Sequence, residues 1–280
     1  MTIRPAAVAG SWYPGSSGAL TREVDAYLDA ADEGPEGEVM AVIAPHAGIM
    51  FSGPVAAFAY KAAARREFDT VILVGPSHFV AFDGVALYPD GAFDTPLGPA
   101  VVNETLGTAL RSRDVVHEMR APHLREHSLE MQLPFLRRLM PNTSIVPLLM
   151  GEQTRETITA LADALADALR DTGALLVAST DLSHYFDAET ADALDRQVRD
   201  AVAHFDMPAL LERFEACPEG ERGRYMGCGA GPMIAVMLAA KALGATGARV
   251  LHYAHSGEIS GDHTAVVGYM AAAVGRFAPQ

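Results

Sequence analysis

Cysteines, clusters of basic residues and long apolar runs are all scarce in this sequence of 280 residues. Its 2 cysteines, Cys217 and Cys228, are too few for the disulfide framework of a small secreted protein. The chain carries 21 basic and 35 acidic residues, a formal charge of −14, and no basic run is longer than two residues. Because binding to a nucleic-acid backbone needs a clustered basic surface, we expect no nucleic-acid partner.

Membrane and export signals are also lacking. The longest strongly apolar stretch, 233–240, ends at Lys241, far short of the roughly 20 residues that a membrane-spanning helix needs. The first residues contain one Arg and only a short apolar stretch, which is too little for the core of a signal peptide. We therefore expect no membrane span and a location in the reducing cytoplasm.

Short apolar runs alternate with longer helical patterns along the chain. Runs such as 39–43, 71–74 and 174–178 are continuously apolar, which is typical of strands buried on both faces of a sheet. The clearest helix is 154–170, where apolar residues recur every three or four positions. Similar patterns predict further strands at 85–88, 144–149, 250–253 and 265–270, and helices at 189–205 and 229–243. We predict a single α/β domain over 1–280 with a mostly parallel or mixed central sheet flanked by helices.

Histidines follow three of these apolar runs at the point where each strand is expected to end. They are His46 after 39–43, His78 after 71–74, and His184 after 174–178. Ligands of open α/β sheets bind in the crevice beyond the carboxyl ends of the strands. One histidine alone is usually a hydrogen-bonded structural residue, but three at equivalent strand ends indicate a binding site.

Cys228 lies between glycines, directly before the apolar part of the predicted helix 229–243. The unpaired N–H groups and the dipole of a helix N-terminus can lower the pKa of a thiol and favour the thiolate, which is the form that binds metal. Cys217 lacks such surroundings, and we expect it to be an inert buried cysteine.

A metal site is the simplest role for these residues. His46, His78 and Cys228 together offer two nitrogens and one sulfur and leave coordination positions open, as reactive metal sites do. Asp181 and His184 lie three residues apart in one turn. We expect Asp181 to orient groups around the metal and His184 to exchange a proton.

The segment HLREH at 123–127 offers an alternative, because it matches the H-x-x-E-H pattern of inverted zinc peptidases. In those enzymes two histidines on one helical face bind zinc and the glutamate activates water. Pro122 and Pro134 interrupt the helical pattern around this segment. A zinc hydrolase using His123 and His127 therefore stays an alternative prediction.

Seven segments along the chain, in order, resemble the Memo family, whose bacterial and archaeal members are also called AmmeMemoRadiSam system protein B. They are RPAAVAGSWYP at 4–14, APHAG at 44–48, GPSH at 75–78, EHSLEMQLPF at 126–135, STDLSHY at 179–185, CGAGP at 228–232, and SGD at 260–262 with VVGY at 266–269. Together they cover almost the whole chain. The fold of this family resembles that of class III extradiol dioxygenases, which are ring-cleaving non-haem iron enzymes.

The resemblance implies roles for the residues singled out above. It implies that His46, His78 and Cys228 bind the metal, with Cys228 standing where the dioxygenases use a Glu. It also implies that His184 occupies the acid/base position of the dioxygenases and that Asp181 lines the same pocket.

The resemblance also bears on neighbouring residues and on partners. His127 and Glu130, within the shared segment 126–135, become candidates for groups that support the ligands from behind. His123 lies outside that segment, which weakens the peptidase alternative. The family name suggests a radical-SAM protein as a partner. Animal members differ around the motif of His184 and after the shared Cys-Gly, so their receptor and motility functions are not transferred to this chain.

Two functions of different classes remain open. The first is a metal-dependent oxidoreductase of unknown substrate, with Fe(II) as the first candidate and open positions for O₂ and a substrate oxygen. Copper and zinc are further candidates because a thiolate is softer than a carboxylate, and this also puts ordinary catechol cleavage in doubt. The second is a non-enzymatic protein whose crevice binds a small molecule, peptide or partner protein. The remaining histidines are expected to be surface or structural residues: His117, His204, His252, His255 and His263.

Overall fold

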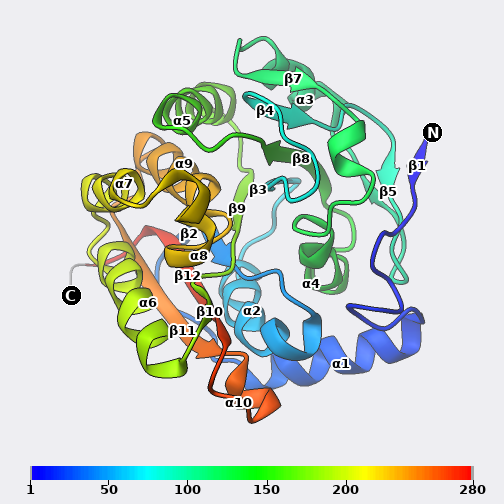
Figure 1. Cartoon of the computed structure of the whole chain (residues 1–280). Coiled ribbons are helices and arrows are strands. Elements are labelled where there is room, and N and C mark those ends of the chain that lie inside the picture. Colours follow the sequence, from blue (N-terminus) through cyan, green and yellow to red (C-terminus); the bar gives the residue numbers. More distant parts are fainter. Residues whose placement is uncertain (1, 279–280) are drawn as a thin grey trace.

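A nine-stranded mixed sheet forms the centre of the computed structural model, which describes residues 2–278 (Figure 1). The strands are β1 (Ile3–Arg4), β2 (Glu38–Ala44), β3 (Thr70–Pro76), β4 (Val85–Leu87), β5 (Ala92–Phe93), β6 (Ala100–Val101), β7 (Val116–Glu118), β8 (Ser144–Met150), β9 (Leu175–Ser179), β10 (His184–Phe186), β11 (Gly247–His255) and β12 (Val266–Arg276). The order in the sheet is β10-β12-β2-β9-β3-β8-β4-β7, with β11 paired to β12. Strands β2, β9, β3 and β8 are parallel, while β12 is antiparallel to β2. Strands β1, β5 and β6 form a separate small sheet.

Helices cover both faces of the central sheet (Figure 1). On one face lie α1 (Ser17–Ala30), α2 (Ile49–Ala63) and α4 (Leu133–Leu139). On the other lie α3 (Glu104–Arg111), α5 (Arg155–Leu169), α6 (Ala188–Ala203), α7 (Met207–Ala216) and α9 (Ala230–Ala242). Short helical segments are α8 (Arg222–Tyr225), α10 (Gly257–Ser260), η1 (Ala121–His123), η2 (Glu130–Gln132) and η3 (Glu219–Glu221).

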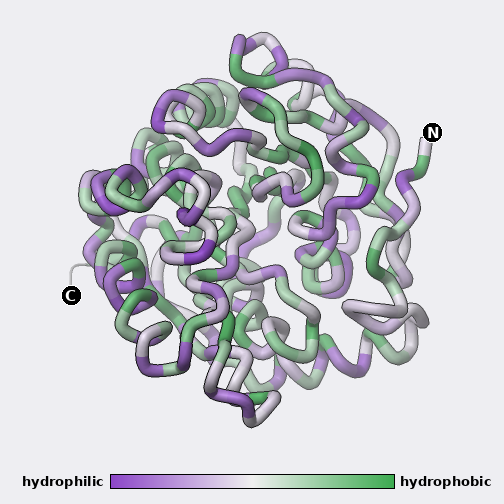
Figure 2. Tube along the Cα trace, in the orientation of Figure 1, coloured by the Kyte–Doolittle hydropathy of each residue, from purple (hydrophilic) through white to green (hydrophobic). Residues whose placement is uncertain are grey.

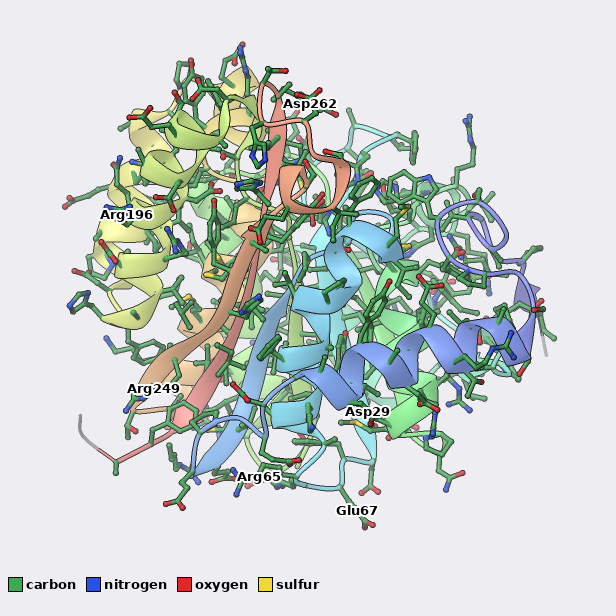
Figure 3. The ribbon with its side chains drawn as sticks, turned by 90° about the horizontal axis from the view of Figure 1, so that it is seen from below. Asp29, Arg65, Glu67, Arg196, Arg249 and Asp262 are labelled. Atoms are coloured by element: carbon green, nitrogen blue, oxygen red, sulfur yellow. The ribbon has the colours of Figure 1, made fainter. Side chains whose placement is uncertain are left out.

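Residues of the central strands are buried on both faces. In β2, Ile43 belongs to the core beneath α5 and α9, while its neighbour Val42 belongs to the core beneath α1 and α2. Figure 2 shows this apolar interior, and Figure 3 shows charged side chains such as Asp29 and Arg196 pointing outward from the helices. The predicted fold class, an α/β fold with a mixed central sheet flanked by helices, is confirmed.

Helix α9 is buried, as its apolar sequence predicts, and it packs against α5 and α7. No single helix within residues 2–278 is long and apolar enough to cross a membrane. The segment Glu219–Tyr225 and α9 reach that length and hydropathy only together, and they meet at a bend of 78°.

Several elements differ from the sequence-based expectation. The run 250–253 belongs to the longer antiparallel strand β11, and α6 ends at Ala203 because Phe205 has a left-handed φ of 55°. Helix α2 is not predicted from the sequence, because it contains Gly53 and Pro54, two residues that disfavour a helix interior. A Cβ at position 53 would lie 2.7 Å from the Tyr27 ring of α1, so this glycine permits close packing of the two helices.

The carboxyl ends of β2, β3 and β9 lie at one edge of the sheet. Ala44 pairs with Ser179, and Val74 pairs with Ala178. The loops that follow these strands therefore start at nearly the same level, and they carry the predicted site residues.

Candidate metal centre

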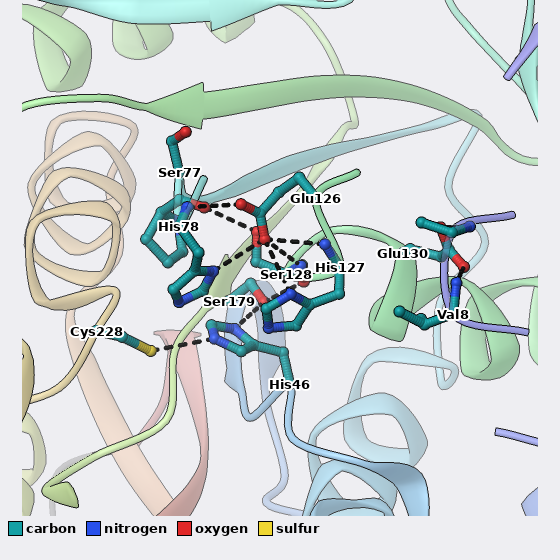
Figure 4. Close-up of polar contacts among 12 residues, drawn as sticks. Val8, His46, Ser77, His78, Glu126, His127, Ser128, Glu130, Ser179 and Cys228 are labelled. Carbon is teal, nitrogen blue, oxygen red and sulfur yellow. Dashed lines mark hydrogen bonds and ion pairs between the residues drawn. The ribbon is translucent and has the colours of Figure 1, made fainter. Parts of the chain in front are cut away.

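Three loops bring His46, His78 and Cys228 together at this edge (Figure 4). His46 follows β2, His78 follows β3, and Cys228 lies two residues before α9. One ligand atom from each residue lies within 4.8 Å of the others, and Cys228 Sγ is 3.1 Å from His46 Nε2. The structure thus brings together the three residues predicted as ligands; that they bind a metal stays a prediction.

The imidazole of His46 is held in one orientation by Ser179. His46 Nδ1 is 2.8 Å from Ser179 Oγ, which also accepts a hydrogen bond from Gln132 Nε2 at 2.7 Å. Ser179 Oγ donates its own proton to the carbonyl of Ser128 at 2.6 Å. Since that proton is used, His46 Nδ1 must be the donor to Ser179, and its Nε2 keeps a lone pair facing Cys228. Burial, and secondarily the neighbouring histidines, hold the pKa of His46 well below its usual value.

Glu126 holds His78 in the corresponding way. Its carboxylate accepts a hydrogen bond from His78 Nδ1 at 2.9 Å, which leaves Nε2 of that ring available. It also accepts the backbone N–H groups of His78 at 2.6 Å and of His127 and Ser128 at 2.9 Å each. Burial raises the pKa of Glu126, but these bonds outweigh it and lower the pKa to about 2. Burial lowers the pKa of His78, but nearby Cys228 and Glu126 outweigh it and raise the pKa to about 10.

The glycines beside Cys228 allow the chain to pass close to the loop after β9. Gly227 has a φ of 138°, and a Cβ there would lie 2.5 Å from the carbonyl oxygen of Asp181. A Cβ at Gly229 would lie 2.3 Å from the carbonyl oxygen of Ser179. The expected lowering of the thiol pKa at a helix N-terminus is not found. Burial raises the pKa of the Cys228 thiol, and hydrogen bonding to His78 offsets this only in part.

Asp181 and His184 face the same cavity as the three candidate ligands. The buried Asp181 carboxylate accepts the backbone N–H groups of His46 at 2.7 Å and Ala47 at 3.3 Å. Burial raises the pKa of Asp181, although nearby His184 and these hydrogen bonds act against it. His184 Nδ1 is buried and has no hydrogen-bond partner within residues 2–278. Asp181 therefore fixes the turn of His46, and His184 presents an imidazole whose hydrogen-bonding capacity is not used up.

His127 lies beside the candidate ligands, as the resemblance implies. Its ring centroid is 4.6 Å from that of His78 and 5.6 Å from that of His46. Burial and the neighbouring His78 lower the pKa of His127 to about 4. The single tryptophan of the chain, Trp12, packs against it with ring centroids 4.3 Å apart.

Glu130 does not contact the candidate ligands, although the resemblance implies that it supports them from behind. Its carboxylate bonds to Arg4 at 2.6 Å, the N–H groups of Ala7 and Val8 at 2.8 and 2.9 Å, and the Tyr13 hydroxyl at 2.8 Å. Glu130 therefore anchors the N-terminal segment. Its link to the cavity is indirect, through the wall that this segment forms.

His123 lies apart from the cavity. Its side chain is buried, its Nε2 is 3.0 Å from the carbonyl oxygen of Ala86, and its ring packs against Tyr88 and Phe93. It belongs to no group of three candidate ligands within the described chain. The segment 123–127 is also not a regular α-helix, so the structure does not support the zinc-peptidase interpretation.

The other cysteine and histidines stay outside the cavity lining. Cys217 follows α7 and is partly exposed, so the expectation that it is buried is wrong. His252 stacks on Phe58 at 4.4 Å, and His255 contacts His263 at 5.4 Å. His117, His204 and His263 are exposed, and His252 and His255 are partly exposed.

The fold and the cluster together define an α/β protein with a potential metal site at the carboxyl edge of its sheet. The family described as "Memo-like protein" matches residues 4–273. A MEMO1 family protein of Methanosarcina mazei is 37% identical and covers 97% of this chain and 98% of its own. A MEMO1 family protein of Methanothermobacter thermautotrophicus is 36% identical, and the match covers 95% of this chain and 98% of that protein. The chain belongs to the Memo family, and the resemblance of its sequence motifs is confirmed.

A solved structure supports the fold. The crystal structure of an uncharacterized protein from Escherichia coli K12 superposes with a TM-score of 0.60 and 14% sequence identity. The match covers 85% of this chain and 100% of that one. At this identity the likeness establishes the shared fold alone.

Proposed function

We propose that His46, His78 and Cys228 bind one transition-metal ion and that the protein is a non-haem metal-dependent oxidoreductase. The observation that carries this proposal is the orientation of the donors. Both imidazoles are anchored through Nδ1, so that each Nε2 is turned toward the Cys228 thiol. Because the pKa of His78 is raised, its Nε2 would give up a proton on binding an ion. Ligand histidines in metal sites are typically held by such an outer hydrogen bond.

The donor set fits the proposed ion. Two imidazole nitrogens and one thiolate suit Fe(II), copper and zinc, and three protein ligands leave coordination positions open. We propose Fe(II), with copper and zinc as competitors because thiolate is a soft ligand. When bound, such an ion supplies open coordination positions and redox chemistry to a substrate in the cavity.

The protein groups around the site would transfer protons and position the candidate ligands. His184 lines the cavity close to Asp181 and Cys228, so it is the proposed residue for exchanging a proton with the substrate. Asp181 positions His46 through the backbone and also lines the cavity. The burial of His46 keeps water from its ring and favours the neutral imidazole that binds metal.

Metal analysis tests this proposal. Protein purified without oxygen is expected to retain about one equivalent of a transition metal, and Cys228→Ser or His78→Ala should lose it. His255→Ala is the matched control and should keep the metal. Wild-type protein that is metal-free and takes up no added iron, copper or zinc would contradict the proposal. Oxygen consumption with candidate substrates then tests for turnover.

A binding function without turnover is the second candidate. Phe79 and Tyr185 are 53% and 69% exposed and contact His127 and His184, respectively, which suits a peptide or a partner protein such as a radical-SAM protein. This candidate predicts capture of the partner by wild-type protein and equally by Cys228→Ser. Capture that depends on the metal, together with turnover, would favour the oxidoreductase.

A further inference from the structure

The segment 219–225, formed by η3 and α8, makes one wall of the cavity. The cavity has a volume of about 570 Å³, and this segment contributes Gly220, Glu221, Gly223 and Arg224 to its lining. Figure 1 shows α8 next to β10, the strand that begins at His184. Among the described residues, Arg224 is the only Lys or Arg that lines the cavity. The wall is therefore glycine-rich, with one positive and one negative side chain.

The two charged side chains of this wall are about half exposed and form only a long ion pair with each other. Arg224 Nη1 is 3.7 Å from Glu221 Oε2, which is too long for a hydrogen bond. For comparison, the ion pair of Arg138 and Asp25 has a distance of 2.6 Å. Glu221 Oε2 is buried without a hydrogen-bond partner within residues 2–278. The wall thus presents one anion and one cation with unused hydrogen-bonding capacity.

The guanidinium of Arg224 is held in place by aromatic rings. Its Cζ atom lies 4.7 Å from the centroid of Phe186 and 5.9 Å from that of Tyr225. A planar guanidinium stacked in this way loses less conformational freedom when it binds a carboxylate in the plane of its N–H groups. Arg224 is therefore suited to bind a carboxylate.

The N-terminal segment gives the cavity a flat apolar surface. Trp12 lines the cavity, is 38% exposed, and is packed against His127. The hydrogen bond of Tyr13 to the buried Glu130 fixes the adjacent backbone. Aromatic rings of ligands pack well on such rigid aromatic surfaces.

We propose that the ligand of this cavity is an aromatic α-amino acid. Its carboxylate binds Arg224, its ammonium group binds Glu221, and its ring packs against Trp12. A group with neighbouring opposite charges offers a partner to both side chains, whereas Glu221 repels a simple anion and Arg224 repels a simple cation. This inference rests on the proposed function in taking the cavity as the substrate site, and it names the class of substrate.

Calorimetric titration with three related probes tests the inference: L-tyrosine, hydroxyphenylpropionate, which lacks the ammonium group, and tyramine, which lacks the carboxylate. Wild-type protein should bind L-tyrosine roughly tenfold or more tighter than either analogue. Arg224→Gln should remove the advantage of tyrosine over tyramine. Glu221→Gln should remove its advantage over hydroxyphenylpropionate. Glu219→Gln, a neighbouring charge outside the cavity lining, should change neither preference.

Blocking the cavity adds a control that leaves both charges in place. A Cβ at Gly220 meets no atom within 4 Å, so Gly220→Leu should weaken the binding of tyrosine without disturbing the fold. Equal binding of the three probes, or no binding of tyrosine, would overturn the inference. The metal content of each sample is measured as well. Protein that binds metal but does not prefer tyrosine would refute this inference alone. Protein that prefers tyrosine but takes up no metal would refute only the proposed function.

Discussion

Two walls of the same cavity are built in different ways. The wall at the strand ends is fixed by buried side chains, since Glu126 accepts a hydrogen bond from His78 and Ser179 accepts one from His46. The wall of segment 219–225 has partly exposed charges, and Arg224 and Glu221 lie 3.7 Å apart. In the first wall the side chains that anchor the candidate ligands are bonded within the protein, whereas in the second wall Arg224 and Glu221 form only a long ion pair.

The difference indicates that the two walls have different functions, one in holding the metal ligands and the other in selecting the bound molecule. Metal ligands need fixed directions, so their supporting groups are used up within the protein. Groups that select a ligand must exchange partners when it binds, so they keep unused donors and acceptors. Substitutions in the fixed wall should therefore cost stability, while those in the open wall should change binding alone.

The largest effect is expected for Glu130→Ala. It leaves the fully buried Arg4 guanidinium without its carboxylate, which should lower the free energy of unfolding by about 3–5 kcal/mol. Urea denaturation measures this, and the fluorescence of Trp12 should change because the N-terminal segment is released. A loss below about 1 kcal/mol would contradict this anchoring role. Glu118→Ala, at an exposed ion pair with Arg111, is the matched control and should cost less than about 1 kcal/mol.

A smaller but clear effect is expected for Gly229→Ala in the fixed wall. The new Cβ would lie 2.3 Å from the carbonyl oxygen of Ser179, so the backbone near Cys228 must move. We expect a loss of about 2–3 kcal/mol in unfolding free energy, together with weaker metal retention. Thermal or urea unfolding and metal analysis of the same sample check both. Unchanged stability would show that this close approach is not required.

The pH dependence of stability should reflect His123. Burial lowers the pKa of His123 to about 3, from an ordinary value of 6.5. Below pH 6.5 the unfolded chain binds a proton that the folded protein takes up only near pH 3, so stability falls as the pH falls. In His123→Gln this contribution, about 1.4 kcal/mol per pH unit, should disappear from the slope between those values. Urea unfolding across this pH range measures the slope, and an unchanged slope would refute the assignment.

The smallest effect is expected for Gly220→Ala in the open wall. A Cβ there contacts nothing within 4 Å, so the unfolding free energy should change by less than about 0.5 kcal/mol. Metal content should equal that of the wild type. A loss comparable to that of Gly229→Ala would remove the distinction between the two walls.

The sequence predicts much of the cluster because the relevant signal is local. Buried parallel strands are continuously apolar, and the residue that follows each strand must lie at one edge of the sheet. This reasoning places His46, His78 and His184 beside one another without any knowledge of distances. Cys228 is found through its glycines, which the structure explains by the close approach to β9.

The supporting contacts are not predictable in this way. Glu126 bonds to His78 across 48 residues of sequence, and its neighbour Glu130 bonds to Arg4 across 126. Both are glutamates within one shared segment, so no local pattern distinguishes their roles. The proposed role of Arg224 depends on its long ion pair with Glu221, which no pattern in the sequence indicates.

X-ray absorption spectroscopy of the protein loaded with zinc tests the central claim most directly. We predict one sulfur at roughly 2.3 Å and two imidazole nitrogens at roughly 2.0–2.1 Å from the ion, and this spectrum should be lost in Cys228→Ser, which should not retain the ion. A spectrum without sulfur in the wild-type protein, or one unchanged by that substitution, would contradict it.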